Sequence, residues 1–265
     1  RTVADARKGY LSKAKSRKKE LRQVISMVKE NGLSSTYKYV MNKLEAESPL
    51  GYSCAGEVIG VGDNVNSLNV GDLVACGGQG AYHADVVSVP KNLVVKVPES
   101  VNMKEAAFST IGAIAIQGIR QADLRLGENC LIIGMGLIGQ LTYKILESSG
   151  IFPTGIDIDE NHINYLKKIG LMNVNNRKNL NFDNLIDKNT KGFGYDAVII
   201  SAASQSSDPM EISGILARKK AKIIIVGSVP TGFERKNFYE KELDVRMSSS
   251  YGPGRYDNDY EVKGI

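Results

Sequence analysis

The sequence is poor in the residue types that most often hold zinc. Its 265 residues include three cysteines, Cys54, Cys76 and Cys130, and two histidines, His83 and His162. The cysteines have no CxxC spacing, which argues against a disulfide framework and against a cysteine-rich zinc site. Each cysteine lies in an apolar segment and is most simply a small buried hydrophobic residue. A reducing, cytoplasmic setting is the plain expectation.

Long hydrophobic runs are missing as well. No apolar run approaches the ~20 residues that a membrane-spanning helix needs, and the start of the chain has no signal-peptide pattern. We therefore expect no membrane interaction. The chain begins at Arg1 rather than Met, so a segment upstream could be missing. Apolar residues make up 42% of the sequence, which suits a globular protein of one or two domains.

Acidic residues are scarce at the start of the chain. Residues 1–46 hold 12 Lys/Arg against 4 Asp/Glu, whereas the whole chain has a net charge of +5, so the basic excess belongs to this segment. Apolar residues recur at helical spacing over 16–28 and 35–44, which predicts a basic segment of two amphipathic helices. Their apolar faces need a partner surface on this protein or on another subunit. The basic run 13–19 could touch nucleic acid or an acidic membrane, but we favour a solvated helix face.

The next part of the chain, residues 47–100, is rich in valine and in turn residues. Four short strands are expected over 55–61, 70–75, 82–89 and 93–97, separated by glycine-, asparagine- and proline-containing turns. Short strands at close spacing suggest a small barrel or half-barrel. A helix capped by Asn102 and running to Ile119 follows, and its small, apolar residues predict that it is buried before the next domain.

A glycine-rich loop organises the rest of the chain. The apolar run 130–133 leads into Gly-x-Gly-x-x-Gly over residues 134–139, followed by a helical pattern, which reads as strand, tight turn and helix. Gly134 allows the sharp turn, Gly136 lets a pyrophosphate approach the backbone, and Gly139 allows close packing of helix on strand. The helix start offers free N–H groups to the phosphates.

A carboxylate stands where a ribose-binding acid is expected. The strand pattern 154–156 ends in Asp157, roughly 20 residues beyond the glycines. Asp157 would repel a 2′-phosphate, and no Lys or Arg follows over 158–161, so NAD is favoured over NADP. The competing interpretation is a glycine turn in an unrelated α/β domain beside an unremarkable surface aspartate. The expected cofactor-binding residues are Gly134, Met135, Gly136, Leu137, Ile138, Gly139, Asp157 and Ile158.

Strands and helices alternate after the glycine loop. Strands are expected over 197–201 and 222–226, with an edge strand over 243–247, and helices begin at Asp159 and Asp208. The first of these helices should turn Ile163, Leu166 and Ile169 inward. Such alternation predicts an α/β fold with a Rossmann-like, doubly wound parallel sheet. The carboxyl ends of its strands would line the cofactor crevice with Ser201, Ala202, Ala203, Gly227, Ser228 and Val229.

Several stretches together resemble the medium-chain dehydrogenase/reductase superfamily, the alcohol-dehydrogenase-like proteins. They are residues 56–62 (GEVIGVG), 70–74 (VGDLV), 98–100 (PES), and the glycine loop with Asp157. The resemblance covers residues 50–250 and implies a partial GroES-like β domain over 47–100, a Rossmann dinucleotide-binding domain over 101–250, and a tail over 251–265. One branch of the family is most similar to this chain, and in that branch the module is fused to a glucose–fructose-oxidoreductase-type domain. The similarity rests on the helical segment before residues 50–53 and on the amino-acid sequences of residues 238–243 and 250–256. That branch is associated with sugar or surface-polysaccharide metabolism.

The chain also departs from this family. Zinc-dependent members carry Gly-His-Glu where this chain has Gly51-Tyr52-Ser53, a later cysteine ligand falls near Ile111, and the block of four structural cysteines is absent. No catalytic zinc is therefore expected. Measured against the family, the chain looks cut at both ends, without the opening strands of the barrel or the segment that returns to it.

Candidates for the chemistry follow from these departures. Tyr52 and Ser53 would face the cleft in place of the zinc site, where Tyr52 either relays a proton or fills the space of the absent metal. Tyr251 and Arg255 flank Gly252-Pro253-Gly254 and either bind substrate or form a stiff surface turn. We expect His83 to be a partly buried structural residue and His162 to be solvated on a polar helix face.

The sequence thus favours an NAD-preferring, zinc-independent oxidoreductase. It would transfer hydride to or from a sugar, a nucleotide sugar or another small alcohol or carbonyl compound. The alternative is a non-catalytic dinucleotide sensor or scaffold whose basic helices dock a partner. Nucleic-acid binding through residues 7–22 is a weaker idea. By analogy with related folds, a homodimer could form through the edge strand at 243–250.

Overall fold

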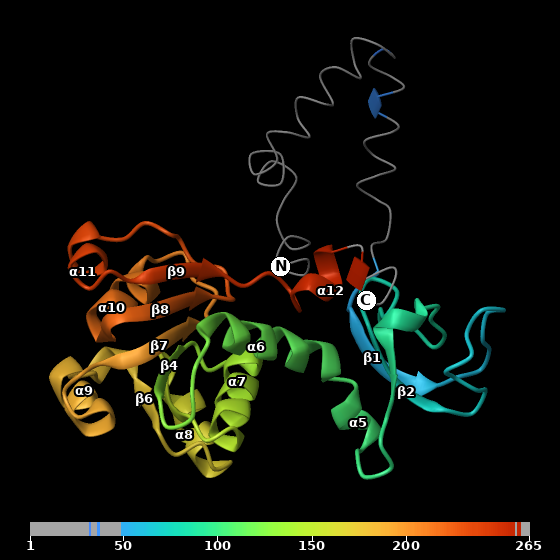
Figure 1. Ribbon diagram of the computed structural model, residues 1–265, viewed down its shortest axis with the longest axis horizontal. Coiled ribbons are helices and arrows are strands. Elements are labelled where there is room, and N and C mark those ends of the chain that lie inside the picture. The colour runs from blue at the N-terminus through green and yellow to red at the C-terminus, as the bar shows by residue number, and fades with distance from the viewer. Residues whose placement is uncertain (1–31, 33–35, 38–48, 258, 261–265) are drawn as a thin grey trace.

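The computed structural model describes residues 32, 36–37, 49–257 and 259–260. This part of the chain contains a three-stranded antiparallel sheet and a six-stranded parallel sheet, joined by a long helix (Figure 1). The fold class predicted from the sequence is therefore confirmed. The two basic helices expected over 16–28 and 35–44 lie outside the described residues, apart from Thr36 and Tyr37.

The small sheet has the order β1-β2-β3, with β1 at Ser53–Glu57, β2 at Leu73–Gly77 and β3 at Val94–Lys96. These strands fall on three of the four predicted segments. The predicted strand over 82–89 is wrong, because this segment forms no strand and folds back over the preceding glycine turn. A side chain on Gly80 would collide with the Ser88 carbonyl, which shows how closely the two pieces of chain approach. A 3-10 turn, η1 (Lys91–Leu93), leads into β3.

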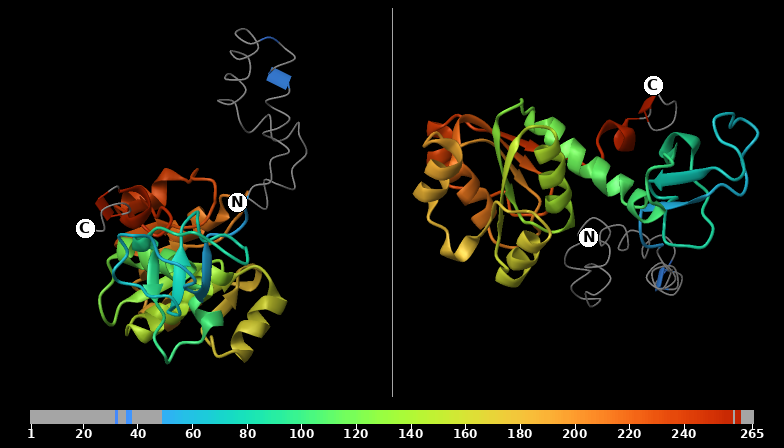
Figure 2. Two further views of the ribbon diagram at one scale, coloured as in Figure 1. Left: turned by 90° about the vertical axis from the view of Figure 1, so that its right-hand side faces the viewer. Right: turned by 90° about the horizontal axis from the view of Figure 1, so that it is seen from below.

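Two helices connect the sheets. α5 (Met103–Ala106) is capped by Asn102, whose side chain accepts from the Lys104 N–H at 2.8 Å, as predicted. The expected single helix is instead broken at residues 107–108, and α6 (Ser109–Ala122) begins after the break. Figure 2 shows α6 running from the small sheet to the large one. Its buried face includes Ile114, Ala115 and Gly118, so the prediction of a buried helix between the two units is confirmed.

The large sheet is parallel throughout and has the order β6-β5-β4-β7-β8-β9. Its strands are β4 (Asn129–Ile133), β5 (Phe152–Asp157), β6 (Val174–Asn176), β7 (Tyr195–Ile200), β8 (Ala217–Ile225) and β9 (Asp244–Met247). The predicted edge position of the last strand is confirmed. β6 at the other edge was not predicted, because three residues with two asparagines carry no clear strand pattern.

Helices cover both faces of this sheet, as a doubly wound fold requires. Side chains from α6, α7 (Leu137–Ser148) and α8 (Glu160–Lys168) pack on one face, against a cluster that includes Cys130 and Ile132. Side chains from α9 (Phe182–Thr190), α10 (Asp208–Leu216) and α11 (Arg235–Glu240) pack on the other, against a cluster that includes Leu131 and Ile133. Successive residues of β4 therefore enter opposite halves of the core. The short elements η2 (Arg177–Asn179) and α12 (Pro253–Tyr256) lie outside these layers.

The buried face predicted for α8 is confirmed in part. Asp159 caps its start and accepts from the N–H groups of residues 161 and 162. Ile163 and Leu166 are fully buried, as expected, but Ile169 is 44% exposed, so that part of the prediction is wrong. The helix ends at Lys168, and Ile169 is therefore beyond its last regular turn. Of the described helices, none is both long and apolar enough to cross a membrane.

Candidate cofactor site and adjoining cleft

The glycine loop forms a tight corner between β4 and α7. Gly134 has a φ of +93°, which few residues with a side chain adopt. A side chain on Gly139 would collide with the Gly134 carbonyl, so α7 packs this close to the strand only because residue 139 is glycine. The space where a Gly136 side chain would stand holds no described atom within 4 Å. The corner is thus compact on its inner side and open at its tip.

The start of α7 is suited to an anion. Gly136 is the N-cap residue, and no side chain caps this helix start. The N–H groups of the first turn of a helix lack partners within the helix, and the helix dipole adds partial positive charge there. Leu137, in that first turn, is 47% exposed. The arrangement can accept phosphate oxygens on backbone N–H groups, which is how dinucleotide-binding loops hold a pyrophosphate.

Asp157, at the end of β5, lies directly against the glycine loop. Its Oδ2 accepts from the Met135 N–H at 2.7 Å, and its Oδ1 accepts from the N–H groups of Ile158 and Asp159 at 2.7 and 3.1 Å. A carboxylate has about four acceptor positions, so capacity remains for a ligand hydroxyl. Ile158 beside it is 65% exposed. The two motifs that define the predicted cofactor site are therefore adjacent in space.

Two further residues hold the glycine loop, and the sequence did not predict this role for either of them. His162 Nε2 lies 2.8 Å from the Met135 carbonyl oxygen, and Gln140 Nε2 donates to the same oxygen at 3.1 Å. His162 is therefore not simply solvated, and that expectation is wrong. His162 lies in the first turn of α8, five residues after Asp157. Its ring reaches the glycine loop from there. The Met135 peptide is consequently held at both its N–H and its carbonyl.

A hollow extends this site past the end of β5. It is lined by Ile158, Asp159, Glu160, Asn176, Lys178 and Asn179. The Asn176 side chain donates to Glu160 across it. Lys178 was not predicted, because it lies 21 residues beyond Asp157 and no local pattern links the two. The hollow is therefore lined by two carboxylates, Asp159 and Glu160, and one lysine, and Asp157 directly precedes its first lining residue in the chain.

The predicted strand-end residues meet beside the glycine loop. The Ser201 hydroxyl donates to the Gly134 carbonyl at 2.5 Å, and Ala203 pairs with Ser228 in an isolated parallel bridge. A side chain on Gly227 would collide with the Ala202 carbonyl. The carboxyl ends of β4, β7 and β8 thus form one continuous rim. Ala202 and Val229 are partly buried and pack against the core cluster that includes Leu131 and Ile133.

The predicted catalytic pair has two different environments. The Ser53 hydroxyl donates to the Ala107 carbonyl at 2.6 Å and accepts from the Thr110 N–H at 3.3 Å, so it joins β1 to the break between α5 and α6. The Tyr52 side chain is 47% exposed and has no such bond among the contacts of the described residues. Ser53 is a structural tie in this arrangement, whereas Tyr52 is accessible.

Two other predicted residues lie near this cleft. The His83 N–H donates to the Leu50 carbonyl at 2.7 Å, and the His83 ring covers Gly51. His83 is exposed, so the expectation of a partly buried residue is wrong. A side chain built on Gly78 would lie 3.4 Å from Tyr251 Oη, which puts Tyr251 at the end of β2, and Gly252 packs on Gln117 of α6. The loop that carries Tyr251 and Arg255 therefore lies at the junction of the two sheets (Figure 1).

The donor set of this region does not match a zinc centre. Among the described residues, no group of three or more His, Cys, Asp or Glu side chains is placed to hold a metal ion. Structural and catalytic zinc sites use at least three such protein ligands. The described residues therefore offer no complete set of zinc ligands.

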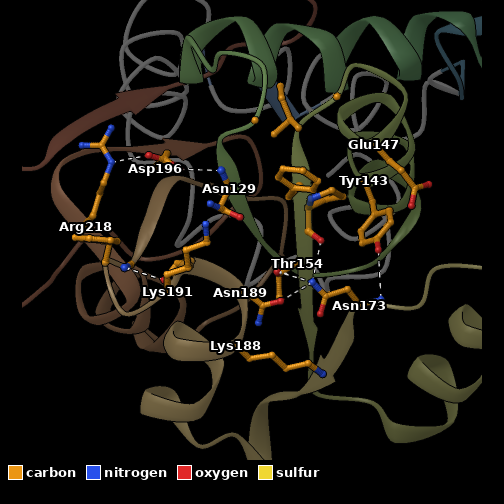
Figure 3. Close-up of a pocket in the computed structure, with 18 residues that line it drawn as sticks. Asn129, Tyr143, Glu147, Thr154, Asn173, Lys188, Asn189, Lys191, Asp196 and Arg218 are labelled. Atoms are coloured by element: carbon orange, nitrogen blue, oxygen red, sulfur yellow. Dashed lines mark hydrogen bonds and ion pairs between the residues drawn. The ribbon is translucent and has the colours of Figure 1, made fainter.

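A larger hollow of about 1060 Å³ lies at the opposite end of the large sheet. Figure 3 shows its polar lining, which includes Tyr143, Thr154, Asn173 and Asn189. Asn173 Nδ2 donates to Thr154 Oγ1 at 2.8 Å and to Asn189 Oδ1 at 2.9 Å, so these side chains mainly satisfy one another. Ligands of doubly wound sheets bind at the carboxyl ends of the strands. This hollow lies at the amino ends and is separate from the glycine loop.

Comparisons with known proteins find dehydrogenases and reductases. A family described as zinc-binding dehydrogenase matches residues 138–262. D-xylulose reductase A of Aspergillus oryzae is 24% identical over 244 residues, covering 78% of this chain and 67% of that protein. D-xylulose reductase of Saccharomyces cerevisiae is 25% identical over 283 residues, covering 91% and 79%.

A solved structure shares the fold. Galactitol-1-phosphate dehydrogenase of Escherichia coli superposes with a TM-score of 0.64 at 20% identity, covering 76% of this chain and 67% of that one. These similarities do not extend to the fused glucose–fructose-oxidoreductase-type domain or to polysaccharide metabolism, which stay predictions. Residues 138–262 are thus similar to zinc-binding dehydrogenases, the chain as a whole is similar in sequence to D-xylulose reductases, and it shares the fold of the solved dehydrogenase.

Proposed function

We propose that this chain is an NAD-preferring oxidoreductase module that transfers hydride to or from a sugar-like or other small alcohol or carbonyl compound. The observation that carries the proposal is the bond between Asp157 and the Met135 N–H, because it joins the acid and the glycine loop into one site. The similarity to D-xylulose reductases supports a polyol or its ketose as substrate.

Each part of the site has a role in this proposal. The first turn of α7 binds the pyrophosphate, Asp157 accepts from the ribose hydroxyls, and Ile158 offers an apolar surface to the adenine. The bound nicotinamide would supply or take up the hydride. Residues 201–203 and 227–229 position the nicotinamide end along the rim. Tyr52 is the candidate that moves the proton at the substrate oxygen, since its hydroxyl is accessible.

The preference for NAD rests on charge. Asp157, Asp159 and Glu160 surround the position expected for the adenosine ribose, and a 2′-phosphate there would meet like charge. Lys178 is the one cation among the described residues that line that hollow, and its charge weakens the discrimination against a 2′-phosphate. We expect calorimetry to give tighter binding of NADH than of NADPH. Tight binding of NADPH alone would overturn the preference.

We also propose that the reaction needs no zinc. Gly51, Tyr52 and Ser53 stand where zinc-dependent members of the family carry Gly-His-Glu, and the Ser53 hydroxyl is already bonded at the α5–α6 break. Elemental analysis of the purified full chain is expected to find zinc well below one atom per chain. Stoichiometric zinc would refute this part of the proposal.

The deciding experiment replaces Asp157 by alanine. A hydrogen bond to a charged group contributes about 1.5–3 kcal/mol, so the Kd for NADH should rise roughly 10- to 100-fold. Asp183→Ala, on α9 of the opposite face, is the matched control and should leave the Kd unchanged. An unchanged Kd for Asp157→Ala would contradict the cofactor site. Turnover is then measured with a panel of sugars, polyols and nucleotide sugars.

A non-catalytic sensor or scaffold is the second candidate. It is favoured by the engaged Ser53 hydroxyl, which leaves Tyr52 as the one predicted catalytic side chain that is accessible. Binding of NADH without turnover of any compound in the panel would support it. Two further proposals hold for either function. The chain divides into a β domain over 47–100, a Rossmann domain over 101–250 and a tail over 251–265, and it forms a dimer through the edge strand at 243–250.

A further inference from the structure

Two of the three cysteines face each other across the small sheet. In the antiparallel pairing of β1 with β2, Cys54 is directly opposite Cys76. Directly opposed residues of an antiparallel pair have Cα atoms about 4.5–5.5 Å apart, and disulfides span Cα distances of about 4.4–6.8 Å. The backbone therefore already brings these two residues within bridging distance.

The side chains of the pair point to the same face. Directly opposed residues of a sheet share a face, and both cysteines line one hollow together with Val58, Val74 and Val94. The other face carries Ser53 and Gly77, which contact α5 and α6 through Ala107 and Thr110. The face with the cysteines is thus the one that a small molecule reaches through the hollow.

We propose that Cys54 and Cys76 form a reversible cross-strand disulfide, which makes this pair a redox-sensitive modification site. Cβ atoms of opposed residues are about 4.5–5.5 Å apart, whereas a disulfide needs about 3.5–4.5 Å. Closing the bridge requires only a small local approach of two strands at one end of the sheet. Cys130 cannot take part, because it is fully buried in β4 of the other sheet.

The oxidant in this proposal is a low-molecular-weight disulfide such as oxidised glutathione. The Cys54 thiolate attacks one of its sulfurs, releases the first small thiol and leaves a mixed disulfide. The Cys76 thiolate then attacks the Cys54 sulfur and releases the second small thiol. Each cysteine loses one proton and one electron, and the small disulfide takes up both pairs as it becomes two thiols.

The environments of the two thiols set the order of these steps. Cys54 is partly exposed, whereas Cys76 is buried. Burial raises the pKa of the Cys76 thiol from 9.0 to about 11. Burial also raises the pKa of Cys54, but its hydrogen bond with Cys76 offsets part of that effect. Attack therefore begins at Cys54, and the buried Cys76 resolves the mixed disulfide.

The test is an oxidation of the full-length chain with increasing ratios of oxidised to reduced glutathione. Free thiols are blocked by alkylation, and the peptides are mapped by mass spectrometry. We expect a linked pair of peptides containing Cys54 and Cys76, lighter by two hydrogen atoms than the free peptides, and dithiothreitol should restore both thiols. Cys130→Ser should form the same link to the same extent, whereas Cys54→Ser and Cys76→Ser should each abolish it.

Three results would overturn the proposal. They are full alkylation of both cysteines under the most oxidising ratio, a mixed disulfide on wild-type Cys54 that never proceeds to the link, and a link that involves Cys130 or a second chain. Each can be read from the wild-type protein alone, so the test does not depend on the folding of a variant.

Discussion

The two sheets of this protein are stabilised in different ways. In the large sheet, helices cover both faces, and β4 and β7 are buried along almost their whole length. In the small sheet, α5 and α6 cover one face; β1 and β3 are half-buried or exposed, and only the middle three residues of β2 are buried. Its buried cluster includes Val58, Val74, Cys76 and Ala81. The candidate cofactor site therefore lies on the sheet that is covered on both faces, whereas the neighbouring cleft is bordered by the sheet that the helices cover on one face.

Truncation of a core leucine should give the largest difference between the sheets. Leu131→Ala removes a fully buried side chain from β4 and should lower the free energy of unfolding by about 2–5 kcal/mol. Val95→Ala, at a 60% exposed position of β3, should change it by less than about 0.5 kcal/mol. Urea unfolding of both variants measures the contrast. Equal losses would mean that the small sheet is as tightly packed as the large one.

The second-largest effect is expected from alkaline pH, which should lower the free energy of unfolding through Tyr195 in the large sheet. Burial raises the pKa of Tyr195 from 10.0 to about 12, so the folded state favours the neutral phenol. The resulting stabilisation is complete below pH 10 and is lost as pH rises through about 12, and it amounts to about 2–3 kcal/mol. Tyr195→Phe cannot titrate and should show a shallower loss of the free energy of unfolding over that interval. Superimposable pH profiles would contradict this assignment.

A smaller effect is expected at the tie between the small sheet and α6. Ser53→Ala removes two hydrogen bonds and should lower the free energy of unfolding by about 0.5–1.5 kcal/mol. Ser53→Thr keeps the hydroxyl and serves as its control. If Ser53 is only a structural tie, the turnover number stays within about twofold, whereas loss of a proton relay would lower it by about 10²–10⁴. Turnover and urea unfolding together separate the two roles.

Prediction from sequence succeeded where local pattern and packing agree. The strands at the centre of the large sheet are continuous apolar runs, and the glycine loop lies between a strand pattern and a helical pattern. The short polar strand β6 was not predicted, because its residues are not typical of a strand. It is a strand because it pairs with β5. The segment 82–89 alternates well enough for a strand, yet it folds over Gly80 instead of pairing.

The candidate site was predictable in part for the same reason. Asp157 and the glycines are separated by a spacing that the parallel β–α–β connection imposes, so their proximity follows from the chain. His162 and Lys178 reach the same site from the first turn of α8 and from the end of β6, and no local pattern marks those approaches. The pairing of Cys54 with Cys76 likewise depends on a strand register that their isolated positions do not reveal.

The sequence by itself determined the parallel sheet, the glycine corner and the acid beside it, because hydrophobic period, glycine conformation and chain length act locally. Only the tertiary structure decided which polar groups are already engaged, as with Ser53, and which residues from distant segments meet, as with His162 at Met135. Those outcomes depend on how separate elements pack, and the free energy of packing is shared among residues far apart in the chain.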